Sequence, residues 1–391
     1  MKNASCDELR ILRERARHIT SDLPPLDRAT DGSLTAQSRE IVQRRIESIL
    51  RKNRAVGASI VFCPPHGKAD IFHFGHARLK PRIPVTDKTC FRIASVSKLV
   101  MSFAALSLTE DGLVDLDADI SAYLGYPVRH PLYPDILVTL RMLLTHSAAI
   151  SDDGPYGMRG MEPGCTLHEL LSNPVCWRKD APGESFHYSN LGAGAAGVVL
   201  ERAANMPFDD ILKTRVFDPL AIRASYDPRR IVPANDLADG YSVRGIFPPR
   251  LRYDAAALAA RPPESFDPER DYLIAAGRMI TDSAGMEKLI RLLGSKDGMG
   301  VLSPASLHMM RSPQGNAGRG LNVAFLPDVF DGFSPVGHQG VAYGMCAELF
   351  ADPASGAGVS VMTSGVRLVR QAPLMRAGFD LLALGFAALK A

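Results

Sequence analysis

The chain has 391 residues, of which 46% are hydrophobic and 22% are charged. A chain of this length and composition folds around a large core, which excludes intrinsic disorder as its general state. Its 45 basic residues nearly balance its 42 acidic ones, and a net charge of +3 offers no electrostatic case for binding nucleic acid. No apolar run reaches the ~18 residues of a membrane-spanning helix, so no membrane partner is expected.

The N-terminal segment, residues 1–35, is polar and charged and contains no apolar stretch typical of a secretory signal. We therefore expect a cytoplasmic protein in which residues 1–35 form an extension packed loosely outside the core. The cysteines are scattered singly along the sequence, and in the cytoplasm such thiols stay reduced. They are Cys6, Cys63, Cys90, Cys165, Cys176 and Cys346.

A helix and a hairpin are predicted next. Residues 36–53 place apolar side chains at helical spacing, which indicates an amphipathic helix. Residues 56–62 and 69–77 are two strand-like runs separated by a His-Gly turn, which predicts a β-hairpin. A helix followed by a hairpin favours helices packed against an antiparallel sheet.

The middle of the chain is predicted to be mainly helical. Residues 97–108 are apolar on nearly every side, which indicates a helix that is buried all round. Residues 114–215 hold short helical patterns divided by prolines, and residues 228–270 are weakly patterned and are expected to form surface loops. A further helix is predicted over 282–294.

Strand-like runs return near the C-terminus. Residues 324–327, 343–352 and 358–365 are predicted strands, and residues 370–386 form a final amphipathic helix. Strands near both ends of the chain then have to meet in one sheet.

Together these elements predict an α/β fold of the α+β type, with an antiparallel sheet flanked by helices and a mainly helical lobe. Residues 36–110 and 275–391 would form the sheet lobe. Residues 111–274 would form the helical lobe with its long loops, and the extension 1–35 would lie outside both.

The first motif that carries chemistry is S-x-x-K, formed by Ser95 and Lys98 at the start of the buried helix. Side chains three residues apart share a helix face, so the Lys98 amine can reach the Ser95 hydroxyl. A serine hydroxyl needs a base to become a nucleophile, and a lysine desolvated by an apolar helix can take that role. The helix N-terminus adds a positive field that favours an oxyanion near Ser95. The alternative is a capping serine beside a solvated lysine.

A second motif, Y-x-N, is formed by Tyr188 and Asn190 ahead of a helix rich in small residues. A phenol beside an ammonium can act as a second base, so Tyr188 is a candidate partner of Lys98. Asn190 is a candidate to orient the lysine and to bind a substrate carbonyl. The alternative is a strand or turn tyrosine followed by an asparagine cap.

A third motif, H-x-G, is formed by His338, Gln339 and Gly340. A glycine in a strand allows the backbone to approach a ligand closely. The N–H of Val341 can then face the N–H of Ser95, and two such groups form an oxyanion hole. The alternative is a partly buried histidine at the start of a strand.

Two other patterns are weaker. GAGAAG (192–197) matches a dinucleotide-binding loop, but no apolar strand precedes it, so small residues that let a helix pack closely are the better interpretation. HFGH (73–76) has no further ligands at a spacing suited to a metal. No metal and no cofactor are therefore expected. Asp152 and Asp153 are interpreted as loop carboxylates.

The order of the three motifs resembles the serine β-lactamase and penicillin-binding-protein superfamily. The likeness is closest to its class C-like branch, with its esterases, D-aminopeptidases, DD-peptidases and acyltransferases, and it extends over residues 38–385. The segments that carry it are FRIASVSKLV, EDGLVDLDADISAYL, VTLRMLLTHSAAI, APGESFHYSNLGAGAAGVVLERA and LSPASLHMMRSPQ.

The resemblance implies a role for each motif residue. Ser95 would be the acylated nucleophile, with Lys98 and Tyr188 as the acid–base pair. The main chains of Ser95 and Val341 would form the oxyanion hole. The substrate-binding positions would be Asn190, His338, Gln339 and Gly340.

Two positions depart from the family's pattern. Many β-lactamases carry a lysine where this chain has His338, and a largely neutral histidine weakens the anchor for a substrate carboxylate, which favours an esterase, amidase or acyl-transfer role. Relatives commonly have glycine where Ala149 stands, which predicts a reshaped loop beside the pocket. His146, which lies beside the site in the family's pattern, is interpreted as structural.

We therefore expect a serine hydrolase that cleaves an ester or amide of a small molecule through an acyl-Ser95 intermediate. Two alternatives stay open. An acyltransferase of the same fold would pass the acyl group from Ser95 to an amine or alcohol in small-molecule biosynthesis. A catalytically silent binding protein would use the same fold without chemistry.

Overall fold

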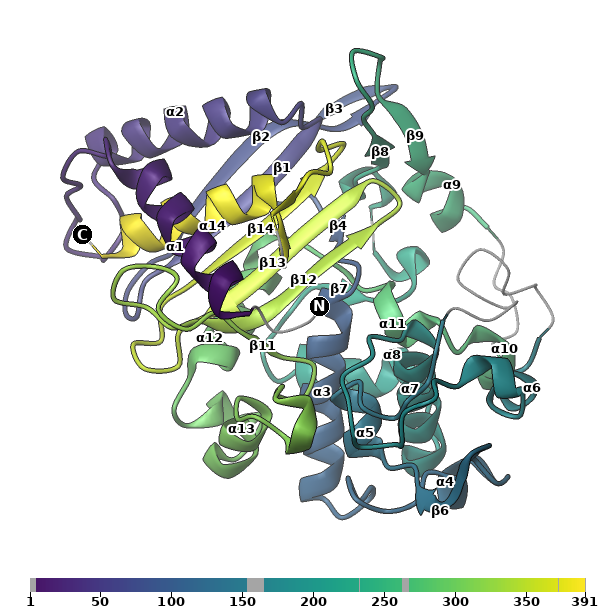
Figure 1. The fold of residues 1–391 in the computed structure, drawn as a ribbon. Coiled ribbons are helices and arrows are strands. Elements are labelled where there is room, and N and C mark those ends of the chain that lie inside the picture. The colour runs from purple at the N-terminus through teal and green to yellow at the C-terminus, as the bar shows by residue number, and fades with distance from the viewer. Residues whose placement is uncertain (1–4, 153–164, 232, 262–266, 372, 391) are drawn as a thin grey trace.

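The structure, a computed structural model, describes residues 5–152, 165–231, 233–261, 267–371 and 373–390. Within these residues one large sheet has seven strands: β1 (Gly57–Cys63), β2 (Asp70–Leu79), β3 (Arg82–Pro84), β11 (Ala324–Phe325), β12 (Val336–Ala342), β13 (Met345–Ala351) and β14 (Gly358–Ser364). Their order is β11-β12-β13-β14-β1-β2-β3, and each strand is antiparallel to its neighbours (Figure 1). The predicted α+β class with an antiparallel sheet is confirmed.

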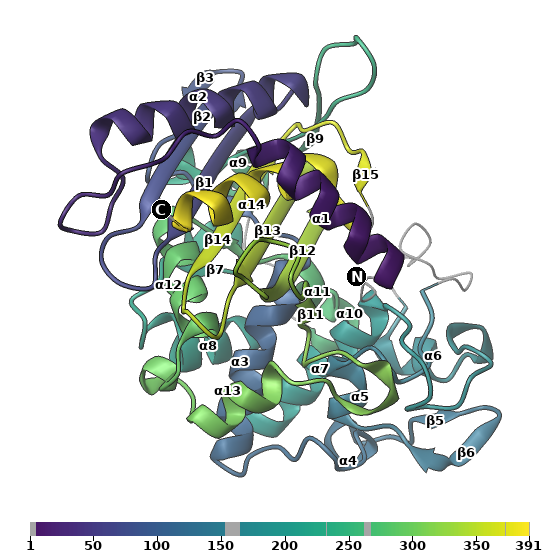
Figure 2. The ribbon, with the colours of Figure 1, turned by 60° about the vertical axis from the view of Figure 1, so that its left-hand side comes forward.

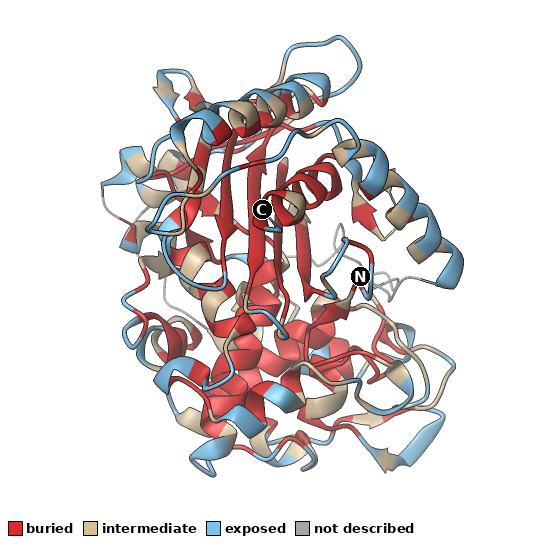
Figure 3. Cartoon of the chain, turned by 90° about the vertical axis from the view of Figure 1, so that its left-hand side faces the viewer, coloured by how far each residue is buried: buried red, intermediate tan, exposed pale blue. Residues whose placement is uncertain are grey.

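Strands from the two ends of the chain lie side by side in this sheet. Ile60 of β1 stands opposite Val361 of β14, and on its other side β1 pairs with β2 to form the predicted hairpin. Every residue of β1 is buried, because elements pack against both faces of the sheet (Figure 3). Ile60 and Phe62 belong to the core on one face, and Val61 to the core on the other.

Three helices from the chain ends cover one face of the sheet. They are α1 (Cys6–Thr20), α2 (Ala36–Lys52) and α14 (Arg376–Leu389) (Figures 1 and 2). Helix α2 coincides with the amphipathic helix predicted over 36–53.

Helix α1 corrects the expectation that the N-terminal segment packs loosely outside the core. Leu9, Leu12 and Ala16 recur at helical spacing on one side of the helix, and Leu12 is fully buried. Arg15 donates two hydrogen bonds of 2.7 Å to Asp380 of α14. The largely polar composition of this segment concealed a narrow apolar stripe that fits against α14.

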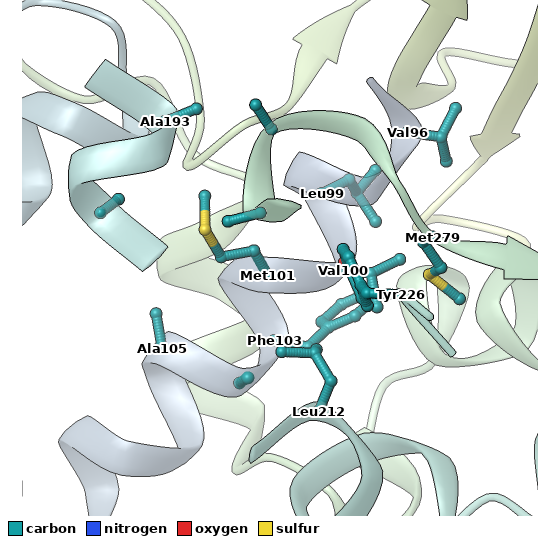
Figure 4. Packing of buried hydrophobic residues seen from close by; sticks show 14 of the residues in the cluster. Val96, Leu99, Val100, Met101, Phe103, Ala105, Ala193, Leu212, Tyr226 and Met279 are labelled. Atoms are coloured by element: carbon teal, nitrogen blue, oxygen red, sulfur yellow. The ribbon is translucent and has the colours of Figure 1, made fainter. Parts of the chain in front are cut away.

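The other face of the sheet leads to a second core built around α3 (Val96–Glu110), α7 (Asn190–Ala204) and α12 (Ser283–Gly294). All residues of α3 from Val96 to Leu108 are buried, which confirms the prediction of a helix buried all round. Figure 4 shows the packing of several apolar ones, among them Leu99 and Phe103. A Cβ added at Gly197 of α7 would lie 2.4 Å from the Cβ of Ala275, so the small residues of GAGAAG do allow close packing.

A small three-stranded sheet contains the strand that directly precedes α3. Its strands, in the order β4-β10-β7, are β4 (Phe91–Arg92), β10 (Ile280–Thr281) and β7 (Ala224–Ser225). The remaining helices are α4 (Ser121–Leu124), α5 (Leu140–Leu144), α6 (Leu167–Leu171), α8 (Phe208–Leu212), α9 (Ala255–Ala259), α10 (Pro268–Asp271), α11 (Ile274–Gly277) and α13 (Pro304–Met310). The two-stranded sheets are β5 (Arg129–His130) with β6 (Tyr133–Leu137), β8 (Gly240–Ser242) with β9 (Arg250–Tyr253), and β15 (Arg370–Gln371) with β16 (Leu374–Met375).

Two segments differ from their predictions. The stretch 228–270, predicted as loops, contains the hairpin β8–β9, which is held by the buried side chains of Tyr241 and Tyr253 rather than by a regular apolar alternation. The final helix begins at Arg376 and not at residue 370, because the hairpin β15–β16 comes first. Over the described ranges, none of the helices combines the length and the apolar character that crossing a membrane requires.

Candidate active site

Ser95 stands where a strand turns sharply into a helix. The chain leaves β4, passes through Ala94 with φ of +47°, and enters α3 with Ser95 as its N-cap residue. This left-handed turn brings the Ser95 side chain to the positive end of a helix that is buried from Val96 to Leu108. The helix N-terminus favours negative charge at that point.

Lys98 lies one helical turn further along α3, and its side chain is completely buried. Its Nζ donates to Ser95 Oγ at 3.2 Å and to Asn190 Oδ1 at 2.8 Å, and a third hydrogen bond goes to the carbonyl of Ala276. The S-x-x-K spacing therefore produces the predicted contact. The other two acceptors hold the amine in place, so the lysine is neither solvated nor incidental.

Tyr188, which lies just before helix α7, contacts the same serine. Its Oη donates to Ser95 Oγ at 2.7 Å, and its ring centroid lies 5.0 Å from the Nζ of Lys98. The Ser95 oxygen thus lies between the Tyr188 hydroxyl and the Lys98 amine, both within hydrogen-bond reach. Two groups in these positions can take a proton from the hydroxyl and return it later.

Asn190 begins α7, and its backbone and side chain are held by Asp152. Asp152 Oδ2 accepts from the backbone N–H of Asn190 at 2.7 Å and from its Nδ2 at 2.9 Å, and Oδ1 accepts from Ser189 Oγ at 2.8 Å and Leu191 N at 3.0 Å. Asp152 is therefore a positioning residue and not an idle loop carboxylate. No spacing reveals it, since 37 positions separate it from Ser189. Asp153 lies outside the described residues.

Gly340 brings β12 into contact with the turn that carries the serine. A Cβ at this position would lie 2.3 Å from the carbonyl oxygen of Ile93 and 2.6 Å from the backbone nitrogen of Ser95. Only glycine fits there, which agrees with the predicted close approach of the strand backbone. Val341 follows directly on the strand, next to this contact. Its share in an oxyanion hole with Ser95 stays a prediction.

His338 and Gln339 lie on opposite faces of β12. The buried His338 ring stands 6.4 Å from that of Tyr188, centroid to centroid, whereas Gln339 donates to Glu348 Oε1 at 2.7 Å, away from the site. The Gln339 side chain therefore points away from Ser95, and the substrate-binding role predicted for Gln339 stays a prediction. Successive side chains of a strand point to opposite faces, and Gly340 and His338 take the face toward Ser95.

Burial also sets the charge of His338. Its Nδ1 lies 2.6 Å from the carbonyl oxygen of Gln339, and since that oxygen only accepts, Nδ1 carries the proton. Burial, together with the nearby charges of Arg319 and Lys98, holds the pKa of His338 well below its ordinary value. The ring is therefore neutral at pH 7 and provides no fixed cation, as expected for a histidine at this position.

The loop at residues 146–149 packs against Tyr188 through the ring of His146. The His146 ring lies 4.5 Å from the Tyr188 ring, and its Nδ1 accepts from the backbone N–H of Ser189 at 3.3 Å. Ala149 has φ of +58°, the left-handed region that favours glycine. The loop thus keeps a conformation suited to glycine although it carries alanine, and the structural role predicted for His146 matches this placement.

The motifs and their geometry agree with a comparison against known families. The sequence matches the family model described as Beta-lactamase over residues 42–379. The chain belongs to the beta-lactamase family. The membership predicted from the order of the three motifs is confirmed, and the fold is of the serine-hydrolase type.

Proteins similar to this chain include a beta-lactamase, an esterase and a penicillin-binding protein homologue. A beta-lactamase of Providencia stuartii is 26% identical over 198 residues, which cover 50% of this chain and 49% of that protein. Esterase EstB of Burkholderia gladioli is 30% identical over 249 residues, covering 57% of this chain and 62% of EstB. The matched part thus spans about half of these relatives. The octameric penicillin-binding protein homologue from Pyrococcus abyssi has the same fold, with a TM-score of 0.70, 21% identity, and coverage of 88% of this chain and 76% of that one.

Proposed function

We propose that this chain is a serine acyl-enzyme hydrolase that cleaves a carboxylic ester or amide of a small molecule through Ser95. One observation carries the proposal. The Ser95 Oγ accepts hydrogen bonds from both Lys98 Nζ and Tyr188 Oη, at 3.2 and 2.7 Å, at the N-terminus of a buried helix. A silent binding protein has no need to surround a serine oxygen with two proton-transferring groups.

In the acylation step, Ser95 Oγ attacks the carbonyl carbon while its proton passes to the Lys98–Tyr188 pair. One member of the pair starts deprotonated in this step, and it accepts the hydrogen bond from the Ser95 hydroxyl instead of donating one. The carbonyl oxygen becomes an oxyanion beside the N-terminus of α3, where backbone N–H groups stabilise it. The bond to the leaving alcohol or amine then breaks, and the pair returns the proton to that group. An acyl ester on Ser95 remains.

In the second step, a water molecule attacks the acyl ester and gives its proton to the same pair. The tetrahedral species collapses, the carboxylic acid leaves, and the proton restores the Ser95 hydroxyl. Asn190 keeps the Lys98 amine directed at the serine during both steps, through its 2.8 Å hydrogen bond. An amine or alcohol that replaces water in this step would make the chain an acyltransferase.

The test is hydrolysis of p-nitrophenyl butyrate, butyramide-type amides and a penicillin by the wild type and by Ser95→Ala. Ser107→Ala is a matched control, because Ser107 lies on the same helix at its far end. We expect ester turnover that Ser95→Ala loses and Ser107→Ala keeps. Butyryl transfer to added amines or alcohols in place of butyrate release would identify the acyltransferase. Turnover that survives Ser95→Ala would overturn the proposal, as would no turnover with any class of substrate.

A further inference from the structure

The loop that joins β8 to β9 exposes apolar side chains at the edge of the molecule. Figures 1 and 2 show this loop projecting beyond the helices and strands around it. Ile246 is 91% exposed and Phe247 is 68% exposed, and no other large hydrophobic side chain among the described residues is as exposed as either. Since exposed apolar residues are normally scattered singly, two adjacent ones at a projecting tip need an explanation.

The tip, residues 244–250, has a defined shape, although its apolar side chains belong to none of the cores. Phe247 N donates to the carbonyl of Arg244 at 3.1 Å, which closes a turn around Gly245. Arg54, just after α2, donates to the carbonyl of Phe247 at 3.0 Å and also to that of Gly245. A turn fixed in this way loses little conformational freedom when it binds a partner.

Another segment lies beside the tip. Arg54, which contacts the tip, lies between α2 and β1. Arg367 N donates to the carbonyl of Asn53 at 2.8 Å, which brings the segment 365–371 to the same place. This segment presents a further apolar side chain, Leu368, which is 49% exposed. Exposed apolar side chains from two distant parts of the sequence therefore belong to one region of the surface.

This region carries positive charge without acidic residues. Residues 52–56, 240–253 and 365–371 contain no Asp or Glu, although the whole chain has 42 acidic residues against 45 basic ones. Across the part of the chain that the structure describes, none of their exposed cations forms an ion pair. These cations are Lys52, Arg244, Arg250, Arg252, Arg367 and Arg370. The charge of the region thus suits a partner that is itself negative.

A narrow apolar tip among cations fits an anionic bilayer better than other negative partners. Apolar side chains can enter the boundary between lipid headgroups and acyl chains, while arginines stay at the level of the phosphates. Pro248 and Pro249 lack N–H groups, so the tip brings fewer unpaired donors to the lipid. Nucleic acid would use the cations but would leave Ile246 and Phe247 in water. A protein partner needs a broad contact of about 800 Å² on each side, which a projecting turn does not offer.

We propose that residues 244–250 dock the chain on a membrane of anionic phospholipids. Ile246 and Phe247 enter the interfacial layer, and the cations of the same region bind lipid phosphates. Such a contact needs no apolar run of spanning length, whose absence was the ground for expecting no membrane partner. The proposal is independent of the chemistry at Ser95.

Sedimentation with vesicles tests this docking on the whole chain. The vesicles contain phosphatidylglycerol and phosphatidylcholine in equal parts, or phosphatidylcholine alone. We expect a partition coefficient roughly tenfold or more higher on the anionic vesicles, and a fall as salt is raised from ~0.1 M to ~0.5 M, because salt screens the cations. Equal binding to both kinds of vesicle, or binding to neither, would overturn the proposal.

The double variant Ile246→Ser with Phe247→Ser tests the apolar part of the contact. It should lower the partition on anionic vesicles by roughly tenfold or more and leave the Tm unchanged, because both side chains lie in solvent. The matched control is Leu132→Ser with Val175→Ser, which removes side chains that are 62% and 52% exposed elsewhere on the surface. Binding that survives loss of the tip side chains would be purely electrostatic and would contradict the proposal.

A second double variant, Arg244→Gln with Arg250→Gln, tests the charge. It should also lower the partition by roughly tenfold or more. Lys179→Gln with Lys296→Gln makes the same change in net charge at exposed positions outside this region, and it should keep the binding. Equal losses in the two double variants would show that net charge alone attracts the chain, which contradicts docking through the tip.

Phe247→Trp reports whether the tip enters the lipid. Trp177, the single tryptophan of the sequence, is 7% exposed, so its emission is a background that the wild type measures. On anionic vesicles the new indole should shift its emission to shorter wavelength and be quenched by lipids with brominated acyl chains. Leu132→Trp should show neither effect. An unshifted and unquenched Phe247→Trp would overturn the proposal, as would a dimer in ultracentrifugation that needs Ile246 and Phe247 while vesicles are not bound.

Discussion

The carboxylate of Asp152 determines which end of the Asn190 side chain faces Lys98. Asp152 Oδ2 accepts from Asn190 Nδ2 at 2.9 Å, which leaves Asn190 Oδ1 directed at Lys98 Nζ, 2.8 Å away. The same carboxylate satisfies the first N–H groups of α7. Asp152 therefore orients the Asn190 amide that holds the Lys98 amine, and it also stabilises helix α7, which carries Asn190.

Asp152→Asn should weaken both functions. An amide in this place offers one acceptor oxygen instead of two, so donors from residues 189–191 lose their partners. We expect the free energy of unfolding to fall by about 1–3 kcal/mol and kcat/KM for an ester to fall by roughly tenfold or more, since a misplaced catalytic group slows the chemistry. Urea unfolding and ester kinetics check the two effects.

The control for that variant is Asp282→Asn. Asp282 caps α12 by accepting from Gly285 N at 2.9 Å, a contact that an asparagine oxygen can also make, so its replacement should leave kcat/KM nearly unchanged. Wild-type kcat/KM in Asp152→Asn would show that the Asn190 amide needs no such orientation.

Tyr188→Phe should remove a proton-transfer group and leave the packing intact. The variant loses the 2.7 Å contact to Ser95 Oγ but keeps the ring against His146. We expect kcat/KM to fall by roughly 10²–10⁴-fold, the usual contribution of a positioned acid or base, with an unchanged Tm. Tyr123→Phe is the control, because its hydroxyl accepts only from Asp115 N among the described residues. A loss of less than threefold in Tyr188→Phe would leave Lys98 as the only base.

Gly340→Ala should disrupt the close contact between β12 and the turn that carries Ser95. The added methyl would lie 2.6 Å from Ser95 N and must push the two segments apart. An oxyanion hole displaced in this way typically costs about 10²-fold or more in kcat. Gly192→Ala is the matched control, since its Cβ would meet nothing nearer than 3.5 Å. If both variants keep wild-type kcat, the backbone at Gly340 has no part in the reaction.

Glu348 should make the stability of the fold depend on pH. Its Oε1 accepts from Gln339 Nε2 at 2.7 Å and Cys346 Sγ at 3.2 Å, and burial raises its pKa from 4.5 to about 7. Between these values the folded chain holds a proton that the unfolded chain releases. The stability contributed by the neutral carboxyl is therefore fully present below pH 4.5 and is lost as the pH rises through 7.

Glu348→Gln should remove this dependence. Relative to the wild type, the variant should gain up to about 3 kcal/mol of unfolding free energy between pH 4 and pH 8, at ~1.4 kcal/mol per pKa unit. The difference between the two proteins is the quantity to measure by urea unfolding, because the pKa of Glu201 is also raised to about 7 by burial and contributes equally to both. Parallel stability curves would contradict the assignment.

The sequence predicted those parts of the site that depend on local geometry. Ser95 and Lys98 meet because residues three apart share a helix face, and Gly340 allows the close approach expected of a glycine in a strand. Tyr188 came from the order of motifs and not from any local pattern. The segments around Ser95 and Tyr188 are brought together by the tertiary fold, to which no spacing rule applies.

The remaining contacts of the site follow only from the three-dimensional structure. The H-x-G motif places Gln339 between His338 and Gly340, but strand alternation directs its side chain at Glu348. Asp152 contacts Asn190 across a separation of 38 positions, which no motif spans. The boundaries of the two lobes stay a prediction, although strands from both ends of the chain do share one sheet.

The central claim, that Ser95 becomes acylated, is tested most directly by covalent labelling. The wild type, Ser95→Ala and Ser107→Ala are each exposed to a fluorophosphonate probe, and the intact masses are measured and the adduct is mapped by peptide sequencing. The account predicts one adduct on the wild type and on Ser107→Ala, located at Ser95, and none on Ser95→Ala. An adduct that persists in Ser95→Ala, or a wild type that takes no label, would contradict it.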